Sequence, residues 1–262
     1  MNATNAVPAV VNAISIIEYL SQEKCESATL TEISDTLLIN KSTCLRILRT
    51  LEAKEYLKFN MDTKKYSLGF RFVMVGEKAK QLNTYLEIAT SILEEHAHPE
   101  VTFVLAKRTA GNKLMYVVVQ EPRLPIRLRL SSETFPIPYA GVGKCFLAFL
   151  PENEAKEILD EIVVDGKLPQ YTPNTITSIK EFKAQIKKIQ LEGIIESNKE
   201  FVPDISSVAC PILNEQGEIV LALGGYILEH YKEMIDIEGL KKDMKEIARK
   251  ISKAIQGLMI EI

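Results

Sequence analysis

The stretch NKSTCLRILRTLE, residues 40–52, combines three cationic side chains with two short hydroxyl side chains, Ser42 and Thr43, at the start of one helical pattern. Its apolar residues recur at helical spacing and predict one buried side: Cys44, Ile47, Leu48 and Leu51. The same spacing leaves a polar side composed of Lys41, Ser42, Arg46, Arg49 and Thr50, with Thr43 near the edge. This polar side is either a solvated helix face or a surface for binding phosphate.

The neighbouring segments favour the phosphate-binding interpretation. TEISDTLL at 31–38 predicts a short helix that Thr29 or Thr31 can cap, with Glu32 near its positive end. YLKF at 56–59 and KYSL at 65–68 flank NMDTK, whose Asn and Asp suit a tight reversal. A first amphipathic helix is expected to about Gln22, with one buried face formed by Val7, Val10, Val11, Ile14, Ile17 and Leu20. Three helices and a hairpin predict a winged helix-turn-helix.

Charge is segregated along the chain. The formal net charge is −3, but residues 41–80 hold ten basic and four acidic residues, a local charge of +6. A concentrated basic region matters more to a polyanion than the total does. A recognition helix uses Lys, Arg and short hydroxyls for phosphates and base edges. We therefore expect Ser42, Thr43 and Arg46 to enter the DNA groove, and Lys41, Arg49, Lys64 and Lys65 to contact mainly phosphates.

The composition, 46% hydrophobic and 26% charged over 262 residues, is that of a soluble globular protein. The longest nearly apolar run, residues 219–228, is too short to span a membrane. MNATNAVPAV at the start lacks the features of a signal peptide, so we expect a cytoplasmic protein. The four cysteines form no CxxC pair, which indicates neither a disulfide framework nor a zinc ribbon.

The remainder of the chain predicts a linker and a second domain. Residues 70–98 contain no proline and predict one long connecting helix, with Pro99 at the boundary. Expected strands are VTFVLAK, KLMYVVVQ, IRLRL, VACPIL and EIVLALGGYI. Helices are expected after Gly143, after Pro151, from the capping box at Ser178, and over 238–256. This mixture predicts an α+β fold with domains at 1–69, 70–98 (linker) and 99–262.

Four stretches point to a known family: KSTCLRILRTLE, the YSLG that closes the wing, PIPYAGVGKCFLAFLPE, and the segment from EGI at 192–194 through VACPILNEQGEIVLAL. In these stretches the sequence resembles the IclR-type transcriptional regulators, and the resemblance covers nearly the whole chain. Leu38 and Asn40 stand where the family usually has Gly and Pro, and Glu55 where it often has Gly. The resemblance implies a GAF-like, profilin-like mixed α/β effector-binding domain after the winged domain.

An effector site is expected at AGVGKCF, where Gly141 and Gly143 precede the expected helix. Free N–H groups and the helix dipole favour a carboxylate or phosphate there, although glycines before a helix more often serve a turn. The resemblance implies that the backbone of Gly141 and Val142 holds a small organic acid. The remaining pocket wall is expected from Asp204, Cys210, Gly224 and Tyr226, although Cys210 can equally be a packed core thiol.

We expect a regulator rather than an enzyme. The three histidines, His96, His98 and His230, lie in no recognisable catalytic motif, and no nucleotide fingerprint appears. No cofactor or metal is expected. The resemblance favours repression of a catabolic operon, relieved by a small organic acid, and a single winged domain predicts a homodimer or homotetramer on a palindromic operator. The alternative is a small-molecule sensor whose winged domain contacts protein instead of DNA.

Overall fold

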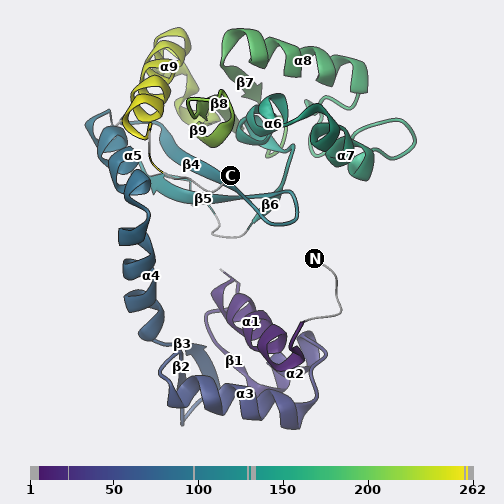
Figure 1. The fold of residues 1–262 in the computed structure, drawn as a ribbon, viewed down its shortest axis with the longest axis vertical. Helices are drawn as coiled ribbons and strands as arrows, with labels where there is room; N and C mark the ends of the chain where they lie inside the picture. The colour runs from purple at the N-terminus through teal and green to yellow at the C-terminus, as the bar shows by residue number, and fades with distance from the viewer. Residues whose placement is uncertain are drawn as a thin grey trace. The chain divides into compact units, whose positions relative to one another are not determined.

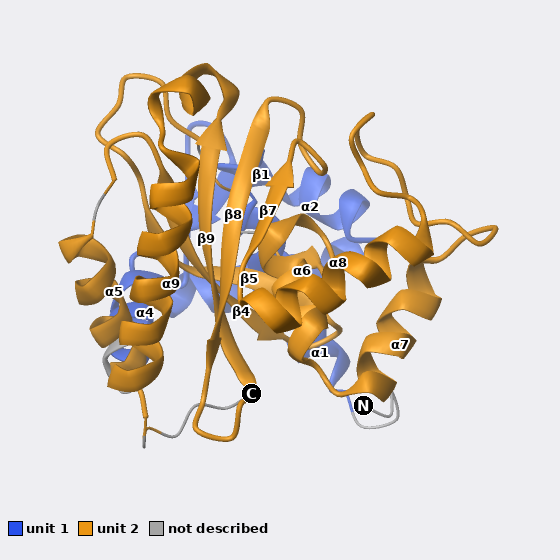
Figure 2. Ribbon diagram, turned by 90° about the horizontal axis from the view of Figure 1, so that it is seen from above, with its two compact units in different colours: residues 1–83 blue, residues 84–262 orange. Residues whose placement is uncertain are grey.

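A computed structural model describes residues 6–22, 24–96, 98–128, 130, 134–256 and 258. The chain forms two compact units, residues 1–83 and 84–262 (Figure 1; Figure 2). The division falls inside the segment 70–98 that the sequence predicts to be a linker. Among the described residues, no helix is long and apolar enough to cross a bilayer.

The first unit is the winged helix-turn-helix. Its elements are α1 (Pro8–Ser21), β1 (Ala28–Thr29), α2 (Leu30–Thr36), α3 (Lys41–Ala53), β2 (Leu57–Asn60), β3 (Lys65–Leu68) and α4 (Arg71–Leu82). The three strands form an antiparallel sheet in the order β1-β3-β2, and the β2–β3 hairpin is the wing. The buried side chains of α1, α2, α3 and the sheet meet in one core that includes Ile16, Ile33, Cys44, Leu48 and Tyr66. The predicted fold of this unit is confirmed.

Local hydrogen bonds explain where α2 begins. Thr29, and not Thr31, is the N-cap: its hydroxyl accepts the Glu32 N–H at 3.2 Å. The Glu32 carboxylate in turn accepts the Thr29 N–H at 2.7 Å, which completes a capping box. These reciprocal bonds lower the pKa of Glu32. Two otherwise unpaired donors at the helix start are thereby satisfied.

The prediction of a single helix over residues 70–98 is wrong. The structure has two helices, α4 and α5 (Thr84–Glu95), separated at Asn83. The Asn83 side chain donates to the carbonyl of Ala79 at 2.7 Å, so it satisfies a free carbonyl at the end of α4. Asparagine competes with helix propagation in this way without any glycine or proline to announce the break.

The second unit is a mixed α/β domain built on one antiparallel sheet. Its remaining elements are β4 (Thr102–Thr109), β5 (Lys113–Gln120), β6 (Phe135–Pro136), α6 (Ala140–Phe149), α7 (Glu152–Ile162), α8 (Ile179–Glu192), β7 (Ile195–Asn198), β8 (Ile205–Leu213), β9 (Ile219–Leu228), η2 (Glu229–Met234) and α9 (Ile237–Ala254). The strand order is β6-β5-β4-β9-β8-β7. Helices α5 and α9 cover one face, and α6 and α8 the other (Figure 2).

Two differences from the expected strands concern the region around the cavity described below. IRLRL at 126–130 is not a strand in its described residues, and Arg129 lies outside them. Leu128 and Leu130 instead line the cavity. The short strands β6 and β7 were not predicted, because two and four residues are too few to show alternation.

Candidate functional site

The outer face of α3 is cationic and exposed. Lys41, Ser42, Arg46 and Arg49 are exposed and Thr43 is half-buried, whereas Cys44 and Leu48 on the opposite side are fully buried. Within the described ranges, none of the three cations forms an ion pair with a carboxylate. Their charges are therefore available to an external anion.

The start of α3 is fixed by Asn40. Its side-chain oxygen accepts the Ser42 N–H at 3.0 Å and the Ser42 hydroxyl at 2.7 Å. Asparagine is a favoured N-cap, which explains why this chain tolerates it where the family usually has proline. No acidic residue occupies the first turn, so the positive helix end stays open to phosphate.

The wing carries two further lysines. Asn60 closes the β2–β3 turn by accepting the N–H groups of Asp62 and Thr63 at 2.9 and 3.0 Å. Lys64 at the tip is exposed with a φ of +57°, and Lys65 opens β3 and is half-buried. All seven residues expected to contact DNA thus lie in the helix-turn-helix unit, on α3 and the wing.

A cavity of about 380 Å³ lies between the sheet, the start of α6 and the loop between β7 and β8. Five of its lining residues carry hydroxyl groups: Tyr116, Thr134, Ser197, Ser207 and Tyr226. The others are apolar or aromatic, including Phe135 and Phe201. This mixture of apolar wall and a few polar groups is typical of a small-molecule site.

Strand pairing places the polar residues in a row. Ser197 on β7 lies opposite Ser207 on β8, which lies opposite Tyr226 on β9, which lies opposite Thr102 on β4. Ser197 and Ser207 are 3% and 5% exposed, and both line the cavity. Both side chains face the cavity that they line, so they are available to a ligand.

The first turn of α6 lies beside this row. A Cβ on Gly141 would come within 3.0 Å of the Ala209 Cβ and 3.3 Å of the Ser207 hydroxyl. The glycine therefore permits helix and strand to approach closely. The N-cap residue Tyr139 makes no side-chain cap bond, so the first amides of α6 have no side-chain acceptor at the helix end.

A pair of tyrosines, Tyr116 and Tyr226, also lines the cavity. The hydroxyls of Tyr116 and Tyr226 are hydrogen-bonded at 2.8 Å, and Phe135 packs 4.8 Å from Tyr116 between ring centroids. Burial raises the pKa of Tyr116 to about 12. Burial, followed by the neighbouring hydroxyl, also raises the pKa of Tyr226. Both phenols are neutral at physiological pH.

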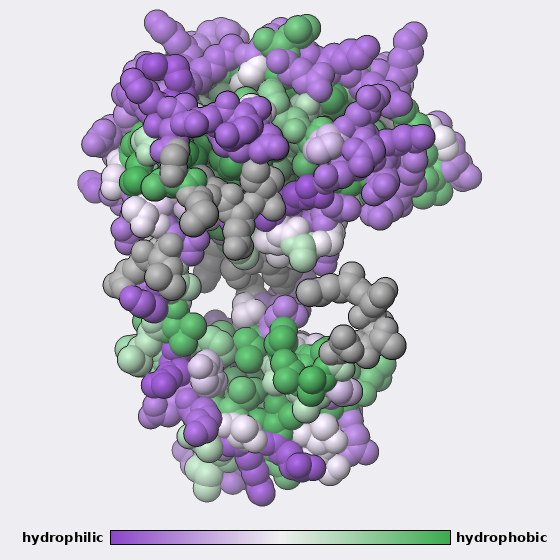
Figure 3. All heavy atoms as spheres, viewed as in Figure 1, coloured by the Kyte–Doolittle hydropathy of each residue, from purple (hydrophilic) through white to green (hydrophobic). Residues whose placement is uncertain are grey.

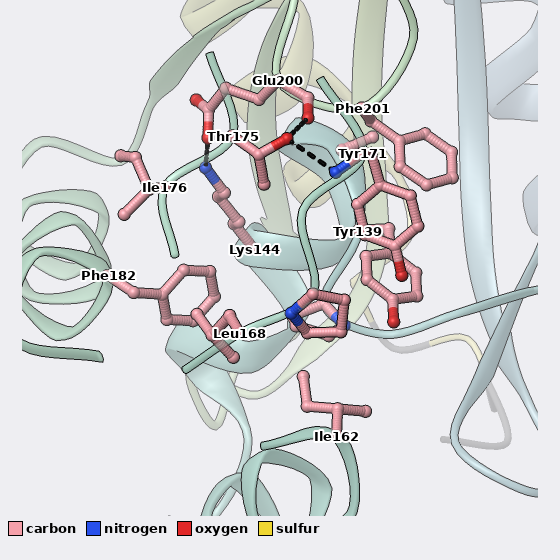
Figure 4. Close-up of a pocket in the computed structure, with 13 residues that line it drawn as sticks. Tyr139, Lys144, Ile162, Leu168, Tyr171, Thr175, Ile176, Phe182, Glu200 and Phe201 are labelled. Carbon is pink, nitrogen blue, oxygen red and sulfur yellow. Dashed lines mark hydrogen bonds and ion pairs between the residues drawn. The ribbon is translucent and has the colours of Figure 1, made fainter. Parts of the chain in front are cut away.

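A much smaller hollow of about 40 Å³ lies next to this cavity (Figure 4). The Lys144 ammonium donates to the Glu200 carboxylate and, at 2.8 Å, to the Gln185 side chain. Phe201 stacks on Tyr139 with ring centroids 5.3 Å apart and also lines the larger cavity. The segment containing Glu200 and Phe201 is thus a shared wall.

Each of the two units matches a known protein family. Residues 9–60 match the IclR helix-turn-helix domain, and residues 94–253 match the bacterial transcriptional regulator IclR C-terminal domain. The chain belongs to the IclR family. The families matched here are those of transcriptional regulators, which confirms the expectation of a regulator rather than an enzyme.

Three IclR-type proteins illustrate the similarity. A crystal structure of an IclR transcriptional regulator from Alicyclobacillus acidocaldarius is 34% identical with a TM-score of 0.85, covering 95% of this chain and 98% of that one. An IclR homologue from Microbacterium hydrocarbonoxydans, crystallised with 4-hydroxybenzoate, is 17% identical with a TM-score of 0.76, covering 94% and 98%. The transcriptional repressor AllR of Salmonella typhi is 22% identical over 84% of this chain and 80% of its own length.

The structure brings only some of the expected effector residues together. Gly141, Val142 and Tyr226 meet on the sheet face covered by α6. Gly224 lies there too, but a Cβ on it would come within 2.8 Å of Val142, so the helix fills the space expected for a ligand. The helix α6 begins at Ala140, not after Gly143, because both glycines serve close packing inside it.

Of the six residues expected to form the effector site, only Tyr226 is among those that line the cavity. Cys210 packs in the core between α9 and the opposite face of the sheet, where burial raises its pKa to about 12. The packed-thiol interpretation therefore fits its position. Asp204 is exposed before β8, and its carbonyl accepts the Glu229 N–H at 2.8 Å. The residues that sequence reasoning missed are Tyr116, Ser197 and Ser207. Strand alternation places Ser207 and Ala209 on one face of β8, but the pairing of β8 with its neighbours is needed to show that this face lines the cavity.

Proposed function

We propose that this IclR-family chain is a cytoplasmic transcriptional repressor of a catabolic operon, controlled by a small organic acid. The observation that carries the DNA-binding part is the exposed cationic face of α3. The N-terminus of this helix is capped by Asn40 and has no acidic residue in its first turn. Ser42, Thr43 and Arg46 contact the major groove, while Lys41, Arg49, Lys64 and Lys65 contact phosphates. The repressor role is supported by the similarity to AllR.

The effector part is supported by the cavity at the start of α6. The hydroxyls of Ser197 and Ser207 and the adjacent helix amides suit a carboxylate. An IclR homologue of the same fold was crystallised with 4-hydroxybenzoate, an organic acid. A bound acid alters DNA affinity by favouring one arrangement of the DNA-binding units over another.

A homodimer or homotetramer on a palindromic operator completes the proposal. Helix α1 and its N-cap residue carry an exposed apolar stripe, defined here as Val7, Val10, Val11 and Ile14, each between 46% and 60% exposed. The sequence had placed these four residues on a buried face, and that prediction is wrong for this single chain. Figure 3 shows hydrophobic residues gathered on the surface of the winged helix-turn-helix unit. A second copy of the chain is the natural partner, because two recognition helices are needed to read two half-sites.

The DNA-binding part is tested by titrating a fluorescent duplex that the protein itself has enriched from a random-sequence pool. Arg46→Ala should weaken specific binding by about 1–3 kcal/mol. Arg249→Ala, on the exposed face of α9, is the matched control and should leave the affinity for the duplex unchanged. Affinity should fall steeply with salt, since each phosphate contact releases counterions. Binding that does not depend on salt, or an Arg46→Ala variant with unchanged affinity for the duplex, would refute the assignment of these residues to DNA contacts.

A further inference from the structure

A groove of about 750 Å³ runs along the free edge of the sheet in the second unit. Strand β7 is the last strand in the sheet, and in the described part of the chain it pairs with β8 alone. Helix α8 and the first half of α9 supply the two walls of the groove. In Figure 2, β7 lies at the margin of the sheet between these two helices. The floor of the groove is therefore an unpaired strand edge.

The pairing of β8 shows which backbone groups of β7 face this groove. The Asp204 carbonyl, just before β8, accepts the N–H of Glu229, just after β9, at 2.8 Å. Backbone groups of alternate residues point the same way, so those of Val208 also point toward β9. Glu196 pairs with Val208, and its N–H and carbonyl therefore point away from β8.

A hydrogen bond from outside the sheet agrees with this direction. The Asn198 carbonyl, two residues beyond Glu196, accepts the Asn174 side chain at 3.3 Å. Asn174 lies between α7 and α8 and belongs to no strand. At Glu196 the same direction presents one donor and one acceptor to the groove, which are the groups that an added strand uses.

Each carboxylate that lines the groove has a lysine partner, whereas two of the lining lysines have no carboxylate partner. The four pairs are Glu192–Lys188, Glu196–Lys241, Glu238–Lys241 and Glu200–Lys144. Lys242 and Lys245 on α9 are exposed, and neither forms an ion pair within the residues that the structure describes. The α9 wall therefore offers two positive charges to an acidic partner.

The two faces of β7 differ in chemistry. Glu196 points to the face covered by α9, where its carboxylate meets Lys241 at 2.7 Å. Ile195 points to the opposite face, where it shares a core with Ile189 of α8, and both residues line the groove. A strand added beside β7 would continue both faces, so its side chains would alternate between the lysines of α9 and the isoleucines next to α8.

We propose that this groove docks an extended segment of a partner protein in which acidic and apolar residues alternate. The segment adds a strand to β7 by backbone hydrogen bonds to Glu196. Its carboxylates lie near Lys242 and Lys245, and its apolar side chains cover Ile189 and Ile195. None of the seven residues assigned to DNA lines the groove, so this docking is separate from the proposed function.

The first test is a fluorescence-anisotropy titration of labelled seven-residue peptides with the full-length protein. The probe alternates four glutamates with three valines. One control has the same composition with the valines in a single block, and another has lysine in place of each glutamate. We expect the probe to bind at least about fivefold more tightly than either control, because the block cannot present two faces and the lysines repel α9.

The second test asks whether the peptide pairs through its backbone. Two versions of the probe are compared, one N-methylated at its glutamates and the other at its valines. Alternate N–H groups of a strand point to opposite sides, so only one version should lose binding while the other retains it. Methylated glutamates block a strand antiparallel to β7, and methylated valines block a parallel one.

The third test reverses the charge of the α9 wall. The variant Lys242→Glu/Lys245→Glu should weaken binding of the probe by at least about fivefold, since two attractions become two repulsions. The matched control is Arg249→Glu/Lys253→Glu, which makes the same change in net charge at exposed positions of α9 outside the groove. This control should bind the probe as the unaltered protein does.

Three results would each overturn the proposal: equal binding of the probe and its two controls, equal effects of the two charge reversals, or equal binding of both N-methylated peptides. Self-association that is lost in Lys242→Glu/Lys245→Glu, with no binding of the probe to the unaltered protein, would also overturn it and assign the groove to a second copy of the chain. The DNA titration with Arg46→Ala contains no peptide, so the proposed function stands or falls independently.

Discussion

Glu55 holds a backbone conformation that is costly for any residue with a Cβ. Its φ is +63°, and Leu38 in the turn before α3 has a φ of +54°. Left-handed backbone at a non-glycine residue costs on the order of 1–2 kcal/mol. These are two of the positions where the chain departs from the glycine common in its family, so the backbone has kept the geometry and accepted the strain.

Replacing Glu55 with glycine should therefore stabilise the protein. We expect Glu55→Gly to raise the free energy of unfolding by about 0.5–1 kcal/mol, because relieved strain outweighs the greater flexibility of the unfolded chain. Urea unfolding measures the change. Lys54→Gly is the matched control: its φ of −101° is ordinary, so glycine there should destabilise. Equal effects of both substitutions would contradict the explanation.

The same region shows what a sequence can reveal about single residues. A Cβ on Gly69, in the YSLG that closes the wing, would come within 2.2 Å of the Glu55 carbonyl oxygen, so the motif reflects a real close approach. Within β8 the sequence was less informative. Ser207 faces the cavity and Cys210 the opposite core, and a shift of one residue reverses every face of a strand. Only the register of β8 with β7 and β9 decides which of its side chains face the cavity.

At the scale of elements, the winged unit was predictable because its signals are local. Caps, helical spacing and a turn that begins with Asn each act within a few residues, as at Thr29 and Asn60. The break between α4 and α5 depends on one asparagine side chain and on the packing of α5 against α9. Tertiary contacts of that kind leave no periodic trace in the sequence.

Helix α6 and the loop after β7 are joined by the buried Lys144–Glu200 pair. Their side chains are 5% and 11% exposed. Burial lowers the pKa of Lys144, although the Glu200 carboxylate partly opposes that shift. Removing one member of a buried pair leaves an uncompensated charge and costs about 3–5 kcal/mol.

Glu200→Gln should therefore lower the free energy of unfolding by about 3 kcal/mol or more. Adding Lys144→Met to that variant removes the stranded charge and should recover most of the loss. A double-mutant cycle from urea unfolding measures the coupling. Additive losses from the two substitutions would mean that the pair makes no specific contribution to holding the Phe201 wall of the cavity.

At the scale of the whole molecule, the apolar stripe on α1 is the feature that one copy of the chain leaves unexplained. Ile16 and Leu20 on the same helix are buried in the winged core, so the fold of the unit does not need the stripe. Several exposed apolar residues in one contiguous row mark an interaction surface. Assembly through this surface would pair two DNA-binding units, in keeping with a palindromic operator.

Ile14→Glu should weaken self-association, because a carboxylate within the stripe would be desolvated on pairing. Sedimentation equilibrium should show the dimer dissociation constant raised by at least about tenfold. Leu191→Glu is the matched control: Leu191 is 87% exposed on α8, outside the stripe, and its substitution should leave assembly intact. Of the two variants, only Ile14→Glu should lower the affinity for the operator, since a monomer reaches only one half-site. A dimer of unchanged strength would show that the copies meet elsewhere and leave the stripe to another partner.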